Sequence, residues 1–65
     1  MNVVLRTTLE HLLRHQPVNL NEVGELYRHA LIDLGMMEPP LVEVDGELVF
    51  ATPAAVDALN ASAAP

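Results

Sequence analysis

The sequence predicts a small α+β domain: a two-helix hairpin, then a two-stranded antiparallel β-hairpin and a short C-terminal helix, in the order ααββα. Three observations support this class. Apolar residues recur at helical spacing in the first half, two valine-containing segments flank the turn pair Asp45-Gly46, and Thr52-Pro53 is a typical helix start. Because a two-stranded sheet is marginal alone, we expect it to lie on the helices.

The length of 65 residues allows one domain, which we expect to span residues 1–60, with residues 61–65 frayed. The chain has no cysteine, so disulfides and thiolate zinc sites are excluded. Its hydrophobic content of 51% is sufficient for a folded core. The first residues lack the basic lead and apolar run of a secretory signal, so we expect a cytoplasmic protein.

The first helix is expected from about Val3 to His15. Asn2 can cap its start, and Pro17 prevents its continuation. Its apolar stripe follows i, i+4, i+7, i+8 spacing and consists of Leu5, Leu9, Leu12 and Leu13.

The second helix is expected to start after Asn19, which has Glu22 three residues later in the manner of a capping box. Gly24 then lies inside the helix, and Gly35 fits the left-handed position just past its end, so that Met36 folds back on the helix. The buried stripe consists of Val23, Tyr27, Ala30, Leu31 and Leu34.

The register of the β-hairpin stays open at this point. Strict two-residue pairing around Asp45-Gly46 leaves an acid on each face, whereas a three-residue loop with Gly46 in a left-handed bulge separates the faces better. In that register Glu43 and Glu47 lie opposite each other on the outer face, at some cost in stability. The residues then expected to point inward are Val42, Leu48 and Phe50.

The charge distribution is the most informative feature for function. From Asp33 onward there is no Lys, Arg or His, so the whole net charge of −6 lies in the second half. This asymmetry argues against binding of nucleic acid or an anionic membrane and for a partner that is itself basic. The alternative is that the acids only keep the domain in solution. The acids are Asp33, Glu38, Glu43, Asp45, Glu47 and Asp57.

Catalytic and metal-binding patterns are weak. His11 and His15 have the i, i+4 spacing of a shared metal, but no third ligand is evident, and histidines on a polar helix face are more often solvated. Glu25, His29 and Asp33 form a row better explained by pairing along a helix face. No nucleophile lies in a glycine-flanked elbow, and no glycine-rich loop could hold phosphate. We therefore expect no enzyme, cofactor or metal.

An alternative function is a regulator or dimerisation module derived from a helix-turn-helix domain. The segment from Gln16 to Asn19 has the length of a tight turn between two helices, and a hairpin follows where a wing could lie. DNA-binding proteins need Lys and Arg to contact the phosphates, however, and the charged residues of this hairpin are all acidic. Val3, Val4 and Ile32 fall partly off the buried stripes and could mediate a homodimer.

In its size, its acidity, its lack of cysteine and its run of acids from Asp33 to Asp57, the chain resembles small phage-encoded inhibitors of the anti-CRISPR and DNA-mimic kind. No motif is shared with them. The resemblance implies a non-catalytic inhibitor that docks on a basic, nucleic-acid-binding surface and competes with DNA or RNA. The residues expected to bind the partner are Asp33, Glu38, Glu43, Asp45 and Glu47.

Overall fold

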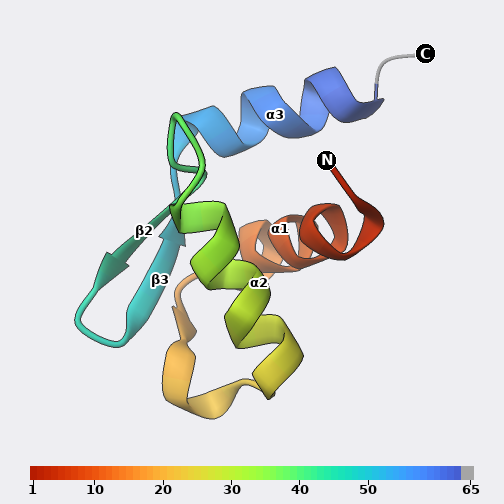
Figure 1. Cartoon of the computed structure of the whole chain (residues 1–65). Helices are drawn as coiled ribbons and strands as arrows, with labels where there is room; N and C mark the ends of the chain where they lie inside the picture. Colours follow the sequence, from red (N-terminus) through yellow and green to blue (C-terminus); the bar gives the residue numbers. More distant parts are fainter. Residues whose placement is uncertain (64–65) are drawn as a thin grey trace.

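Three α-helices, one 3₁₀ helix and a three-stranded antiparallel sheet make up the part of the chain that the structure describes, residues 1–63 (Figure 1). The structure is a computed structural model. It confirms the α+β class and places α3 from Pro53 to Ala63, three residues beyond the expected domain boundary. Ala64 and Pro65 lie outside the described residues. The remaining elements are α1 (Val3–His15), β1 (Val18–Asn19), η1 (Leu20–Glu22), α2 (Glu25–Gly35), β2 (Val42–Asp45) and β3 (Leu48–Ala51).

The third strand is a correction to the two-stranded sheet expected from the sequence. The strands run in the order β1-β3-β2, with Val18 paired to Val49. Two further bonds extend this edge. The side-chain oxygen of Gln16 accepts from the backbone N–H of Ala51 at 2.9 Å, and the N–H of Leu20 donates to the carbonyl of Glu47 at 2.8 Å. Two residues of strand are too short for a periodic sequence signal, so only the tertiary pairing reveals this strand.

The hairpin register differs from both registers considered for the sequence. Asp45 pairs with Leu48, so the turn residues are Gly46 and Glu47. Gly46 has φ +65°, and none of the described residues other than glycine has positive φ. A two-residue turn with only its first residue left-handed fits type II′, whose twist suits a hairpin.

This register decides which side chains of the hairpin face the core. The side chains of Val42 and Val49 are 4% and 0% exposed, and both lie on the face of the sheet that packs on the helices, the inner face. Leu48 and Phe50 lie on the opposite face and are half-buried. The expectation that Val42 points inward is therefore confirmed, whereas the same expectation for Leu48 and Phe50 is wrong. A change of register by an odd number of residues moves a strand's side chains to the other face.

The backbone of Gly46 provides a first prediction. A Cβ at this position would meet nothing within 4 Å, so the cost of Gly46→Ala arises from the positive φ alone. We expect Gly46→Ala to lower the free energy of unfolding by about 1–2 kcal/mol. Gly24→Ala is the matched control, because Gly24 is equally open but has φ −66°. Chemical denaturation should show a much smaller change for the control; equal losses in both variants would contradict the argument.

The ends of α1 agree with the sequence, but those of α2 do not. The side chain of Asn2 caps α1 by accepting from the N–H of Leu5 at 2.8 Å. Asn19 instead caps η1, and α2 begins six residues later, with Gly24 as an N-cap that provides no side-chain bond. Gly35 is the last residue of α2 and is not left-handed, and Met36 is 77% exposed instead of folding back.

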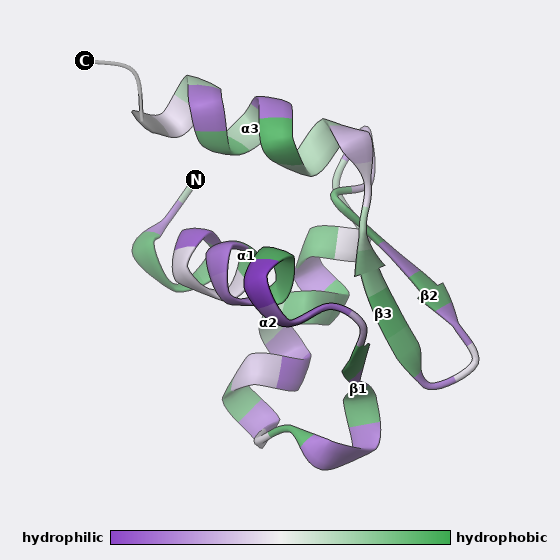
Figure 2. Ribbon diagram, turned by 180° about the vertical axis from the view of Figure 1, so that it is seen from behind, coloured by the Kyte–Doolittle hydropathy of each residue, from purple (hydrophilic) through white to green (hydrophobic). Residues whose placement is uncertain are grey.

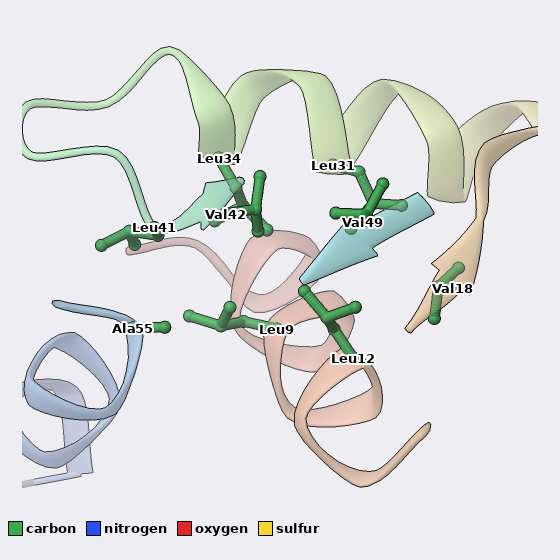
Figure 3. Close-up of a cluster of buried hydrophobic side chains, with 9 residues drawn as sticks. All are labelled: Leu9, Leu12, Val18, Leu31, Leu34, Leu41, Val42, Val49 and Ala55. Atoms are coloured by element: carbon green, nitrogen blue, oxygen red, sulfur yellow. The ribbon is translucent and has the colours of Figure 1, made fainter. Parts of the chain in front are cut away.

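The core lies where α1, α2, α3 and the inner face of the sheet meet (Figure 3). Its completely buried large side chains come from three elements, and Ala55 of α3 covers one end near Leu9 and Leu41. The central strand β3 is strongly hydrophobic, whereas the hairpin turn is hydrophilic (Figure 2). Among the described residues, the largest fully buried side chains are those of Leu9, Leu12, Leu31, Leu34 and Val49.

Candidate functional site

Three of the five acids expected to bind a partner lie on the hairpin. Glu43 and Asp45 are both exposed on β2, two residues apart, so they project from the same face of the sheet. Glu47 is exposed in the turn. The hairpin extends away from the helices (Figure 1), so these carboxylates lie on a projecting part of the molecule.

The face that carries Glu43 and Asp45 also carries apolar side chains. Glu43 pairs with Phe50, and Asp45 pairs with Leu48. Because residues paired across two antiparallel strands lie on the same face of the sheet, these four side chains share a face. The expected opposition of Glu43 and Glu47 is wrong in this register, and with it the like-charge cost across the strands. The outer face of the hairpin, defined here by Glu43, Asp45, Leu48 and Phe50, therefore combines two carboxylates with one leucine and the only phenylalanine of the chain.

Among the described residues, Glu47 is the acid of this set whose side chain accepts a hydrogen bond. Its Oε2 accepts a hydrogen bond from Nδ2 of Asn21 at 2.9 Å. Asn21 belongs to η1, which is itself held by the cap from Asn19. This contact and the backbone bond from Leu20 connect the hairpin turn to η1, so the turn is supported from the β1 side of the sheet.

The two remaining acids of the predicted set lie away from the hairpin turn. Asp33 is exposed on α2, and Glu38 is exposed in the connector between α2 and β2. That connector leads to the base of the hairpin, so the length of β2, about 10 Å, separates Glu38 from the level of Asp45. The structure therefore gathers Glu43, Asp45 and Glu47 on one projection and leaves Asp33 and Glu38 outside it.

A cluster of ring side chains joins α1 to α2. Nδ1 of His11 and Oη of Tyr27 are 2.6 Å apart, and the rings of His11 and His15 lie 4.4 Å apart between centroids. The phenol donates when His11 carries its proton on Nε2, and it accepts in the other tautomer. The sequence shows His11, His15 and Tyr27, but it does not show that His11 and Tyr27 meet, because their contact depends on how α1 and α2 pack against each other. Among the described residues, no three His, Cys, Asp or Glu side chains group to hold a metal ion.

The Tyr27 phenol provides a second prediction. Burial raises the pKa of Tyr27 above its ordinary value of 10.0, because the phenolate loses solvation. The folded state therefore holds this proton more tightly than the unfolded state. The contribution of this group to the free energy of unfolding keeps its full value below pH 10 and falls as the pH rises through the raised pKa of Tyr27. Since Tyr27 is the only tyrosine and there is no tryptophan, phenolate absorbance should show a midpoint above that of the denatured chain. Coincident midpoints would contradict this prediction.

The connection between α1 and α2 does not form the tight turn expected of a helix-turn-helix. Residues 16–24 separate the helices, and they contain β1 and η1. The hairpin does follow α2, but the exposed charged residues at its end, Asp45 and Glu47, are acids and not the bases that would contact phosphates.

None of the described helices has the length and apolar content needed to cross a bilayer.

Comparisons with known proteins identified no relative of this chain. The chain matches no protein-family model, and searches of curated proteins and of solved structures returned no significant match.

Proposed function

We propose that this protein is a non-catalytic docking module whose acidic β-hairpin binds a basic surface of a partner protein. The observation that carries the proposal is the composition of the hairpin: Glu43 and Asp45 share an outer face with Leu48 and Phe50, and Glu47 lies in the adjoining turn. Carboxylates complement Lys and Arg, while an aromatic and an aliphatic side chain supply apolar contact area typical of the centre of a protein interface.

The charge of the second half favours a partner that handles nucleic acid. No basic side chain lies between Asp33 and the C-terminus, so an approaching cationic surface meets no local repulsion, and its association is accelerated at low salt. A hairpin with carboxylates along one face can occupy a cationic channel in place of phosphates. The mechanism we propose is competition with DNA or RNA for such a channel, in the cytoplasm, in keeping with the resemblance to small acidic phage inhibitors.

The test is capture of the partner by the immobilised protein from a lysate of the native host. Bound proteins are washed through a salt series and identified by mass spectrometry, with DNA and RNA added as competitors in parallel samples. We expect a nucleic-acid-binding protein or complex that is released at high salt and displaced by nucleic acid, because screening weakens exposed charge contacts. Recovery of no such complex, or of one that nucleic acid does not displace, would contradict the proposal.

A further inference from the structure

The strand β2 forms one edge of the sheet. The strand order β1-β3-β2 leaves the side of β2 that faces away from β3, called here the outer edge of β2, without a neighbouring strand among the described residues. In both ribbon views β2 is the outermost strand, and its end near the turn extends away from the helices (Figures 1 and 2). An unpaired strand edge presents backbone N–H and C=O groups that fit another extended segment.

The hydrogen bonds of β3 show which of its residues bond on the β1 side. The carbonyl of Glu47, just before β3, accepts from the N–H of Leu20 at 2.8 Å, and the N–H of Ala51 donates to the side chain of Gln16 at 2.9 Å. Both bonds come from odd-numbered residues and lie on the β1 side. Because backbone groups alternate in direction along a strand, the even-numbered residues of β3 direct theirs toward β2.

The backbone groups of Val44 therefore point to the outer edge. Val44 is paired with Val49, an odd-numbered residue of β3, so this pair exchanges no backbone hydrogen bond. The neighbouring pairs, formed by Glu43 and by Asp45, carry the bonds between β2 and β3. Within the described residues, neither backbone group of Val44 bonds to another element, and the residue is 52% exposed.

The side chains along the outer edge select the class of segment that fits it. Val44 lies on the inner face of the sheet, whereas its neighbours Glu43 and Asp45 lie on the outer face, and all three are exposed. A strand that pairs with Val44 places one side chain beside the valine and the two flanking side chains beside the carboxylates. An apolar residue between two basic residues complements this arrangement.

The same carboxylates disfavour pairing between two copies of this chain. Antiparallel pairing of β2 with β2 about Val44 places Glu43 of one copy beside Asp45 of the other, and like charges across a strand pair are destabilising. A segment with Lys or Arg at these positions is attracted instead. The outer edge therefore discriminates against a second copy and in favour of a basic segment.

From the free backbone groups of Val44 and the acids on either side of it, we infer that the outer edge of β2 binds an extended basic segment of the partner protein as a fourth, antiparallel strand. The segment pairs an apolar residue with Val44 and places Lys or Arg beside Glu43 and Asp45. In strand addition of this kind, main-chain bonds give affinity and alternate side chains give specificity. The inference rests on the proposed function, because it names the part of the basic partner that the hairpin binds.

An NMR titration of the purified protein tests the added strand. The probe is a capped heptapeptide of alternating arginine and valine, and we expect the amide resonance of Val44 to shift most among those of β2. Val44→Pro removes the outward N–H, and proline is accepted at an edge position whose N–H makes no bond within the sheet. Val44→Ala is the matched control, because it shortens the same side chain but keeps the N–H. We expect Val44→Pro to bind the peptide at least tenfold more weakly than Val44→Ala.

Modified peptides test the same bonds without any change to the protein. Methylation of the valine nitrogens removes the donors that face Val44, and we expect it to weaken binding at least tenfold. Methylation of the arginine nitrogens, whose N–H groups point away from β2, should leave binding within about threefold of the unmodified peptide. A peptide with glutamate in place of arginine should not bind. If Val44→Pro fails to fold by circular dichroism, these peptides decide the question alone.

Three outcomes would overturn the inference. The heptapeptide could shift no amide of β2, Val44→Pro could bind it as tightly as Val44→Ala, or methylation of the arginine nitrogens could weaken binding as much as that of the valine nitrogens. The capture experiment separates this failure from failure of the proposed function. If folded Val44→Pro captures the basic partner as the parent protein does, the hairpin binds through its side chains and only the inference fails. If the parent protein captures no such partner, the proposed function itself fails.

Discussion

Replacing Leu12 by alanine is expected to lower the free energy of unfolding by about 2–5 kcal/mol. Leu12 is 0% exposed on α1 and belongs to the central cluster with Leu31 and Val49. Removing the three carbons beyond its Cβ forfeits the burial of that apolar surface and leaves a cavity that the neighbouring α2 and β3 can fill only in part. Few other buried side chains are available to compensate, because the cluster of buried hydrophobic residues has nine members among the residues that the structure describes.

For a domain of this size the loss is a large share of its stability, since native domains are stable by about 5–15 kcal/mol. Chemical denaturation followed by circular dichroism measures it, with Met36→Ala as the control because that side chain is 77% exposed. We expect the control to change stability by less than about 0.5 kcal/mol. A loss below about 1 kcal/mol for Leu12→Ala would show that Leu12 is not part of a tightly packed core.

Reversing the charges of Glu43, Asp45 and Glu47 together, each to lysine, is expected to abolish capture of the proposed basic partner while leaving the domain folded. All three side chains are exposed, and within the part of the chain that the structure describes they make one side-chain hydrogen bond, the one that Glu47 accepts from Asn21. An exposed hydrogen bond contributes about 0.5–1.5 kcal/mol to stability, which is a small part of the stability of a domain. The variant should therefore keep the helix content and cooperative unfolding of the parent protein.

Net charge alone must be separated from the position of the charges. Each substitution changes the charge by two, so the triple variant has a formal net charge of zero instead of −6. The matched control reverses three other exposed acids, Glu10, Glu22 and Asp57, and reaches the same net charge with the hairpin intact. We expect this control to retain the partner in the same capture experiment. Equal capture by both triple variants would sink the role of the hairpin, and equal loss in both would assign the effect to net charge.

The position of α1 is a case in which local sequence was sufficient. Its leucine spacing, the Asn2 cap and the stop before Pro17 are all properties of neighbouring residues, and the helix spans Val3–His15 as expected. The start of α2 is the opposite case. Asn19 is a good cap, but β1 draws Val18 and Asn19 into the sheet beside β3, so the cap serves η1 and the helix begins after Gly24.

The sequence by itself determined the α+β class, the order of the principal elements and the concentration of acids after Asp33, because periodicity, turn residues and charge are local properties. Tertiary structure decided the third strand, the hairpin register and the contact of His11 with Tyr27. These features depend on residues far apart in the chain that meet only when the core closes. The register follows from burial of Val42 and Val49, which directs Glu43 and Asp45 outward beside Leu48 and Phe50.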